Sequence, residues 1–375
     1  MVNKTNRSYL SNLKIAGYKS IASNDLAQTI SLKNVNIIIG ANGAGKSNFV
    51  SFFKMLNNIM TGALQLFVGK NGTAENILFF GSKKTPLLSA KLEFANEQNK
   101  DIYEFSLAKS VQDSLIFSEE KIKWNDKEFV LGGGQRESVL FTSEQLNSAQ
   151  RMIKTILSSC KAFQFNDTSD TSHIRNSSEI NNNKFLFSDA GNIASILYLL
   201  KNKNEYLNYY KRIVDYVRFV VPQFDDFELE PNPLNPEYIK LRWRQKGELE
   251  YILGPEQLSD GSIRFIALAT LFLQPPSLLP NVIIIDEPEL GLHPQAVDIL
   301  ATLIKTAAQH SQVIAATQSE RLIDSFNSDD ILVVEYDKKN NCSFFKRLDS
   351  KELSGWLKNY SLSQLWEKNI LGGQP

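Results

Sequence analysis

Residues 40–47 read GANGAGKS and fit the pattern GxxxxGK[ST] of a phosphate-binding loop. In such a loop, glycines let backbone N–H groups point at the phosphates, and the following helix adds the positive end of its dipole. Lys46 would reach the β- and γ-phosphates, and the Ser47 hydroxyl would bind Mg²⁺. The alternative is a chance glycine-rich turn, which gives such a string in about one per cent of chains of this length. The predicted nucleotide-binding residues are Gly40, Asn42, Gly43, Ala44, Gly45, Lys46, Ser47 and Asn48.

A second group of residues able to do chemistry follows the apolar run Val282–Ile285. Asp286 would lie at the carboxyl edge of a buried strand, where ligands bind in open α/β sheets. There it can hold Mg²⁺, and Glu287 can polarise the water that attacks a γ-phosphate. The alternative is a strand that ends in two solvated acids. Glu289 has no equally specific role, and we expect it to belong to loop structure.

The elements that must position these residues alternate between strands and helices. Val35–Ile39 predicts a buried strand before the loop, and apolar spacing from Phe49 to Met60 predicts a helix after it. The same patterns predict later helices at 262–273 and 294–308, and strands at 282–285, 313–316 and 331–336. This alternation predicts an α/β fold with a mainly parallel sheet covered by helices.

The middle of the chain has a different pattern. Strand-like runs from Leu87 to Val130 predict an antiparallel, β-rich lobe, and another strand is expected at Leu13–Tyr18. A polar stretch that runs to about Asn183 is expected to be loop-like or mobile. The remaining predictions are helices at 145–159, 192–200 and 205–221, extended segments at 162–165, 227–231 and 238–245, and a polar helical segment after 349.

Composition limits the function classes. Lys plus Arg (41) equals Asp plus Glu (41), so a strongly basic nucleic-acid clamp or a polybasic membrane binder is not expected. Two cysteines and three scattered histidines lack the spacing of a zinc site and argue against a disulfide scaffold. The first twenty residues lack a signal-peptide core, and the longest apolar stretch is too short to cross a bilayer. We therefore expect a cytoplasmic protein.

The motif Leu258–Ser262 (LSDGS) opens a predicted helix, and by itself it would be an ordinary helix N-cap. Its position shortly before the acidic strand makes the set of motifs resemble the ABC-type ATPase superfamily. The resemblance implies that Ser259 and Gly261 contact the γ-phosphate bound by a second subunit, so that ATP lies between two heads. It also implies that the loop 291–294 lies at the dimer interface.

Three further positions follow from this resemblance. Gln318 stands where the superfamily usually has a histidine that contacts the γ-phosphate. Its amide can donate a hydrogen bond but carries no charge, so hydrolysis is expected to be slow or coupled to a partner. Lys19, followed by Ser20, resembles a short motif that contacts the nucleotide in related heads. Gln164 is either the Q-loop glutamine of the superfamily or a plain strand residue.

The spellings GANGAGKSN, LSDGS and DEPELGLHP together resemble the RecF-like and overcoming-lysogenization-defect (OLD) class. FQFNDTS, GNIASILYLL and LWEKNILGGQP resemble its stand-alone, AAA_21-type members, which lack a Toprim nuclease. The resemblance implies an ABC-type head with a mixed P-loop sheet. Its composite core would comprise residues 1–165 and 256–375, including a β-rich lobe at about 85–135. Residues 166–255 would form an inserted helical lobe that leads to the LSDGS loop (Leu258–Ser262), which corresponds to the signature loop of the ABC-type superfamily.

The function expected from these features is a dimeric switch ATPase that binds ATP and Mg²⁺ and hydrolyses ATP with Glu287, Gln318 and Lys46 as catalytic residues. The resemblance implies a separate, nuclease-like effector protein in bacterial DNA repair or anti-phage defence. An alternative is an ATP-bound scaffold with little hydrolysis. A third possibility, a small-molecule kinase, leaves the signature loop unexplained. DNA is a possible partner, but the lysines near 83–91 and 338–346 are more often solvated charges.

Overall fold

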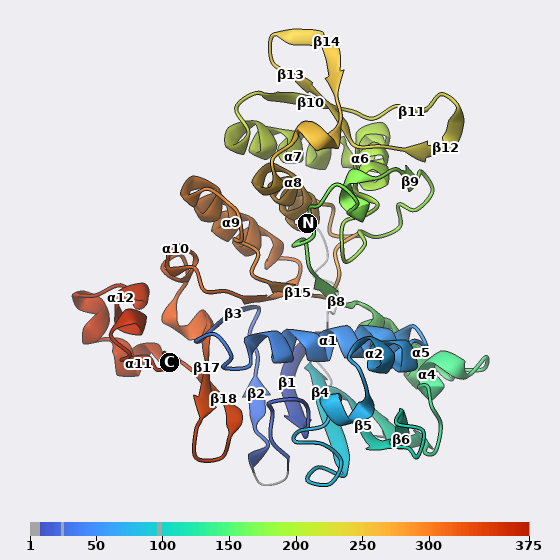
Figure 1. Ribbon diagram of the computed structural model, residues 1–375, viewed down its shortest axis with the longest axis vertical. Coiled ribbons are helices and arrows are strands. Elements are labelled where there is room, and N and C mark those ends of the chain that lie inside the picture. Colours follow the sequence, from blue (N-terminus) through green and yellow to red (C-terminus); the bar gives the residue numbers. More distant parts are fainter. Residues whose placement is uncertain (1–7, 24–25, 96–99, 126, 375) are drawn as a thin grey trace.

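The computed structural model describes residues 8–23, 26–95, 100–125 and 127–374. A central sheet lies between an upper lobe and a lower β-rich lobe (Figure 1). Its strand order is β18-β17-β3-β16-β15-β8. All neighbouring strands are parallel except β17 and β18. The strands are β3 (Val35–Ile39), β8 (Cys160–Phe163), β15 (Val282–Asp286), β16 (Gln312–Ala316), β17 (Ile331–Asp337) and β18 (Cys342–Arg347).

This sheet confirms the predicted α/β fold with a mainly parallel, mixed sheet. Sequence analysis predicts five of its six strands. It misses β18, which follows a polar hairpin turn and pairs antiparallel with β17 at the sheet edge.

The central sheet separates two hydrophobic cores because its side chains alternate between its faces. In β3, Ile37 and Ile39 pack in the upper core with α8 (Asp260–Leu273) and α9 (Pro294–Ala307). Ile38 packs in the lower core with α1 (Lys46–Met60). The strand before the phosphate loop is therefore buried on both faces, which fixes where that loop begins.

The lower lobe is a six-stranded antiparallel sheet in the order β2-β1-β4-β5-β6-β7. Helix α1 lies between it and the central sheet (Figure 1). The strands are β1 (Tyr9–Ala16), β2 (Thr29–Ser31), β4 (Leu87–Ala95), β5 (Lys100–Lys109), β6 (Leu115–Trp124) and β7 (Lys127–Gly132). The nearby helices are α2 (Leu64–Lys70), α3 (Ala74–Ile77), α4 (Val139–Thr142) and α5 (Ser148–Ser158). The predicted β-rich lobe is present, and the N-terminal strands β1 and β2 complete it.

The upper lobe contains the two predicted helices, α6 (Ile193–Asn202) and α7 (Leu207–Val220). It also contains two three-stranded sheets, β10-β13-β14 and β11-β12-β9. Their strands are β9 (Ser178–Glu179), β10 (Phe224–Glu228), β11 (Pro231–Asn232), β12 (Asn235–Ile239), β13 (Arg242–Gln245) and β14 (Glu248–Leu253). Residues 166–183 are loop-like as expected except for a 3₁₀ turn (His173–Arg175) and the two-residue strand β9. Thr168, Ser172 and Arg175 are buried and give the segment fixed packing.

The C-terminal part carries three short helices, α10 (Glu320–Ile323), α11 (Ser350–Leu353) and α12 (Leu362–Glu367). They lie at the side of the central sheet (Figure 1). The segment after α12 returns to this sheet, where the Gly373 backbone N–H donates to Glu335 at 2.9 Å. Within the described residues, no helix is both long and apolar enough to cross a membrane.

Strand β8 forms the outer edge of the central sheet. Its outward backbone groups are met by one side chain from α1. The Ala162 N–H donates to Asn57 Oδ1 at 3.1 Å, and the Asn57 amide donates to the Cys160 carbonyl. Asn57 therefore joins the helix of the phosphate loop to the edge strand.

Candidate functional site

The phosphate loop connects β3 to α1 at the carboxyl edge of the central sheet, as predicted. Gly45 is the residue before α1 and has φ 118°. A Cβ at this position would lie 2.1 Å from Ser343 Oγ and 3.0 Å from Ser20 Oγ. Only glycine fits this close approach and this backbone conformation. Strand β18, which sequence analysis misses, thus supplies a wall of the loop.

Two serines hold the loop from behind. Ser343 Oγ donates to the Ala44 carbonyl at 2.6 Å and shares a 2.7 Å hydrogen bond with Ser20 Oγ. The Asn48 amide donates to Ser20 Oγ at 2.8 Å. In the predicted Lys19–Ser20 motif it is therefore Ser20 that contacts the loop.

Lys46 lies inside the loop and is 5% exposed. Its ammonium donates to the carbonyls of Gly40 at 2.6 Å and Ala41 at 3.0 Å. Burial lowers the pKa of Lys46, whereas the carboxylates that follow β15 oppose this shift. A buried cation in a loop of backbone N–H groups can bind phosphate oxygens with little competition from water.

Lys19 points away from the loop. Its ammonium donates to Ser51 Oγ at 2.9 Å and to Asn71 Oδ1 at 3.1 Å. Burial lowers its pKa, with a smaller contribution from the charge of Lys54. Lys19 and Asn48 line a cavity of about 500 Å³, together with Ser20, Asn71, Phe80 and Tyr336 among others. The predicted residue Lys19 thus lies beside the phosphate loop rather than over it.

Asp286 ends β15, close to the Ser47 hydroxyl. Burial raises the pKa of Asp286, and the charge of Glu287 raises it further, whereas the Ser47 hydroxyl favours the ionised form and so lowers it. Its Oδ1 atom is buried and has no hydrogen-bond partner among the described residues. A carboxylate and a hydroxyl are hard oxygen ligands that suit Mg²⁺. The donor set therefore fits the ion that sequence analysis assigns to these two residues.

Glu287 follows with φ 46°, a left-handed conformation that is unusual for a residue with a side chain. Its backbone N–H donates to the Ala316 carbonyl at 2.8 Å. Its carboxylate accepts a hydrogen bond from the Gln318 amide at 2.8 Å. Such backbone strain persists where surrounding contacts impose it, and it is concentrated at functional sites. The structure thus brings the predicted pair Glu287 and Gln318 together.

Glu289 is not a plain loop residue, contrary to expectation. Its Oε1 accepts hydrogen bonds from the Thr317 hydroxyl at 2.6 Å and the Gln318 backbone N–H at 3.1 Å. Burial raises its pKa. The carboxylate fixes the turn after β16 and thereby positions Gln318. The only signal for this role in the sequence is the presence of a second glutamate two residues after Glu287.

Gln164 follows the edge strand β8 and is exposed. Its backbone N–H donates to the Ser188 carbonyl at 2.8 Å, and its side chain accepts a hydrogen bond from Lys54. Because β8 pairs with β15 in parallel, Gln164 lies at the same sheet edge as Asp286. Burial lowers the pKa of Lys54, and the charge of Asp286 opposes part of this shift. Lys54 is a site residue that sequence analysis missed.

The signature loop lies apart from these groups, at the start of α8. Ser259 is exposed and caps the helix, and its Oγ accepts from the Ser262 N–H at 3.2 Å. A Cβ at Gly261 would lie 2.4 Å from the Gly291 carbonyl oxygen. The N-cap interpretation is therefore correct for Ser259, and its hydroxyl remains accessible from outside the subunit.

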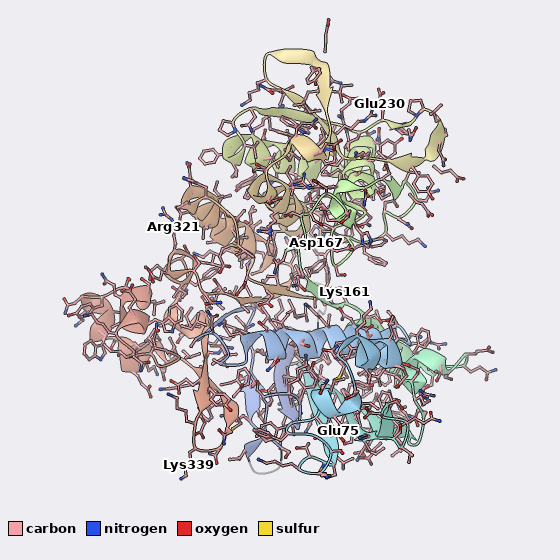
Figure 2. The ribbon with its side chains drawn as sticks, viewed as in Figure 1. Glu75, Lys161, Asp167, Glu230, Arg321 and Lys339 are labelled. Carbon is pink, nitrogen blue, oxygen red and sulfur yellow. The ribbon has the colours of Figure 1, made fainter. Side chains whose placement is uncertain are left out.

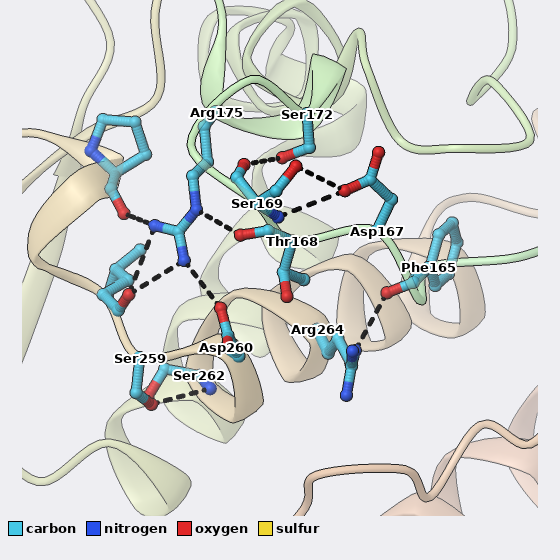
Figure 3. A network of polar contacts seen from close by, with 12 residues as sticks. Phe165, Asp167, Thr168, Ser169, Ser172, Arg175, Ser259, Asp260, Ser262 and Arg264 are labelled. Atoms are coloured by element: carbon cyan, nitrogen blue, oxygen red, sulfur yellow. Dashed lines mark hydrogen bonds and ion pairs between the residues drawn. The ribbon is translucent and has the colours of Figure 1, made fainter.

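Arg264 ties the signature helix to two other loops. Its guanidinium donates to the Phe165 carbonyl at 3.0 Å, the Asn166 carbonyl at 2.8 Å and the Leu290 carbonyl at 2.8 Å. Phe165 and Arg264 are drawn in Figure 3. The loop after β8, the loop after β15 and the signature helix therefore form one hydrogen-bonded unit.

Solved structures with the same fold include the crystal structure of the SmcHead bound to the C-winged helix domain of ScpA. It has a TM-score of 0.62 and 17% identity, and the match covers 92% of this chain and 99% of the other. The Smc head domain with an extended coiled coil from Pyrococcus furiosus gives 0.59 and 15%, covering 94% and 99%. A Pyrococcus yayanosii Smc head gives 0.56 and 13%, also covering 94% and 99%. No curated protein gives a significant match.

The central sheet, the phosphate loop and the acidic strand are arranged as an α/β head with the same fold as the Smc head domains. A family profile described as "AAA domain, putative AbiEii toxin, Type IV TA system" matches residues 35–324. The chain belongs to this family.

Proposed function

We propose that two copies of this chain close on two molecules of ATP·Mg²⁺ and reopen after hydrolysis. The observation that carries the proposal is the division of the site into two parts within one chain. Lys46, Asp286 and Glu287 share one sheet edge, whereas Ser259 is exposed at the start of α8. A second copy would bring its Ser259 to the phosphates that the first copy holds.

Each residue has a stated task in this proposal. Lys46 and the loop N–H groups bind the β- and γ-phosphates, and Ser47 and Asp286 hold Mg²⁺. The ion supplies neutralisation of phosphate charge when it is bound. Glu287 polarises the attacking water, and the 2.8 Å hydrogen bond from Gln318 fixes its carboxylate. Ser259 and Gly261 of the second copy contact the γ-phosphate.

The base and ribose would enter the cavity beside Asn48. The γ-phosphate end of the site faces Asp286 and Glu287, so the opposite end of the triphosphate leads towards Asn48 and Lys19. Phe80 is 56% exposed there and Tyr336 is 42% exposed. Both rings offer a face on which a purine can stack.

Closure can be driven by the γ-phosphate. A ligand shifts an equilibrium only by its difference in affinity for the two states. ATP contacts Ser259 of the partner copy only in the closed state, and ADP lacks the phosphate that makes this contact. ATP therefore favours closure, and hydrolysis removes the preference.

We further propose that the closed dimer acts on a separate, nuclease-like effector in bacterial DNA repair or anti-phage defence, within the cytoplasm. Resemblance of the motifs to the RecF-like and OLD class supports this role. The Smc heads are described in complex with part of another protein, ScpA, which supports the use of such heads as partner platforms.

The test is the oligomeric state of Glu287→Gln, which should bind ATP but hydrolyse it about 100-fold or more slowly. Light scattering after size exclusion should show monomers without nucleotide and dimers with ATP·Mg²⁺. The matched control is Glu335→Gln, a carboxylate on β17 outside the proposed phosphate contacts, which should keep hydrolysis. A Glu287→Gln protein that stays monomeric with saturating ATP would contradict the proposal.

A second candidate is an ATP-bound scaffold that hydrolyses little. The observation that favours it is Gln318, whose uncharged amide already bonds Glu287. Steady-state phosphate release separates the two candidates. Tight ATP binding with background turnover, both alone and with DNA, would favour the scaffold.

A further inference from the structure

Among the residues that the structure describes, Arg175 is a buried cation that has no role in the proposed mechanism. Arg175 is 7% exposed and lies in the upper lobe, in the loop that follows β8. Its guanidinium reaches four residues on two segments (Figure 3). The contacts are the carbonyls of Thr168 at 2.8 Å, Leu258 at 3.2 Å and Pro255, and the Asp260 carboxylate at 3.0 Å.

These contacts hold the residues on either side of Ser259 in the chain. Leu258 precedes Ser259 and Asp260 follows it, so Arg175 fixes the chain on both sides of this residue. The side chain of Ser259 itself bonds only Ser262 of its own helix among the described residues. The direction in which the Ser259 hydroxyl points therefore depends on the segment that Arg175 holds.

Through Thr168, Arg175 is also linked to the carboxyl edge of the central sheet where the phosphate loop lies, here called the nucleotide edge. Thr168 lies four residues after Gln164, which accepts a hydrogen bond from Lys54 of α1. Around Thr168, the Ser169 backbone N–H and hydroxyl both donate to the carboxylate of Asp167 and so form a tight turn. Asp167 lies where the upper lobe meets the central sheet (Figure 2). The same segment thus touches the helix of the phosphate loop and the back of the signature loop.

Only arginine has the geometry for this task. Its planar guanidinium carries five N–H donors in a fixed fork, and here it satisfies three carbonyls and one carboxylate at once. A lysine would keep the charge with three donors on one atom and could not span these acceptors. Asp260 has a lowered pKa because the Thr168 hydroxyl bonds it, with further contributions from Arg175 and Arg264.

We propose that Arg175 is a positioning residue that holds the Ser259 loop in the orientation that binds the γ-phosphate of the partner copy's ATP. Arg175 also couples this loop to the segment after Gln164 in its own subunit. The inference rests on the proposed function. It adds that each subunit's signature loop is set by the loop after its own edge strand.

The test compares two affinities in the Glu287→Gln background. Arg175→Gln should bind ATP as a dilute monomer within about twofold of the parent, because the phosphate loop is intact. Its ATP-driven dimerisation should weaken about tenfold or more. Arg175→Lys should recover only part of this loss, since it restores charge without the fork.

Two further variants separate positioning from general stability. Arg347 is a matched control because it also bonds carbonyls, those of Ser31 at 2.8 Å and Asp330 at 3.1 Å, on the other side of the molecule. Arg347→Gln should lower the melting temperature but leave ATP-driven dimerisation unchanged. Because the Asp260 side chain is exposed, Asp260→Asn should fold even if Arg175→Gln does not. It should weaken ATP-driven dimerisation about threefold.

The location of the defect gives the final readout. In mixed dimers with one Lys46→Ala subunit, ATP binds only the other subunit. Arg175→Gln should weaken association when it lies in the Lys46→Ala subunit, whose Ser259 faces the nucleotide. In the ATP-binding subunit it should have little effect. Equal effects in both positions, or dimerisation equal to the parent, would overturn the inference. Failure of the Glu287→Gln parent to dimerise would overturn the proposed function as well.

Discussion

The nucleotide edge and the signature loop are built in opposite ways. At the nucleotide edge, Lys46 is buried and donates to the Gly40 carbonyl, and the half-buried Glu287 carboxylate accepts a hydrogen bond from the Gln318 amide. At the signature loop, Ser259 is exposed and its neighbours are held from behind by Arg175. The contacts of the nucleotide edge are made within one chain, whereas Ser259 of the signature loop faces outward. The comparison indicates that the first should bind ATP alone, whereas the second should matter only for assembly.

Lys46→Ala should give the largest effect and tests the first region. Loss of the buried ammonium should weaken ATP binding about 100-fold or more, because hydrogen bonds from charged groups contribute about 1.5–3 kcal/mol each. Titration with a fluorescent ATP analogue measures this change. Lys305→Ala, on α9, is the matched control and should bind normally. ATP binding by Lys46→Ala within about threefold of the wild type would contradict the role of Lys46 in phosphate binding.

Ser259→Arg tests the second region. A bulky charge at this exposed position should weaken ATP-driven dimerisation about tenfold or more, while the dilute monomer still binds ATP. Sedimentation of the Glu287→Gln background with and without ATP reports the dimer. Ser354→Arg places the same charge at another exposed serine and should dimerise like the parent. Equal dimerisation of both variants would show that the signature loop is not at the interface.

Phe80→Ala tests whether the adenine base of ATP binds in the cavity beside the phosphate loop. Stacking on an aromatic ring contributes about 1–3 kcal/mol per base, so ATP affinity should fall about fivefold or more. Binding of triphosphate without a base should not change. The control is Phe219→Ala, an exposed ring in the upper lobe (59% exposed). Unchanged ATP affinity in Phe80→Ala would move the base out of this cavity.

Asp286→Asn should give the smallest change, in stability. Burial and the charge of Glu287 raise the pKa of Asp286, so the folded protein binds this proton more tightly than the unfolded chain. Ionised Asp286 therefore costs stability at neutral pH. Without Mg²⁺, Asp286→Asn should melt about 2 °C higher at pH 7.5. The difference should shrink as the pH falls towards the raised pKa of Asp286.

The matched control for Asp286→Asn is Asp349→Asn, an exposed carboxylate outside the sheet edge. It should change the melting temperature little at any pH. A melting temperature of Asp286→Asn below that of the wild type at pH 7.5 would show that the ionised Asp286 carboxylate does not lower the stability of the folded protein.

Local patterns predict the central part of this fold well. The strand Val35–Ile39, the helix after Lys46 and the strand ending at Asp286 have strong apolar periodicity, and all three form close to the expected boundaries. Their order along the chain fixes which side chains meet at the carboxyl edge, because parallel strands place these ends together. The meeting of Glu287 and Gln318 follows from this order.

Contacts between distant segments could not be predicted in this way. Ser343 lies on a strand that sequence analysis misses, yet it bonds the Ala44 carbonyl within the phosphate loop. Arg175 lies in a polar stretch with no periodic signal, and its role depends on carbonyls about 80 residues away. Backbone carbonyls are acceptors in every sequence, so no residue pattern marks which of them an arginine will reach.

The Asn57 side chain has a consequence for assembly. An open strand at the rim of a sheet invites pairing with another chain, and proteins commonly obstruct such rims. Here the amide of Asn57 fills two of the outward positions along β8. A second molecule is thereby discouraged from extending the sheet along β8, which is consistent with the proposed meeting of two copies through loops rather than through this strand.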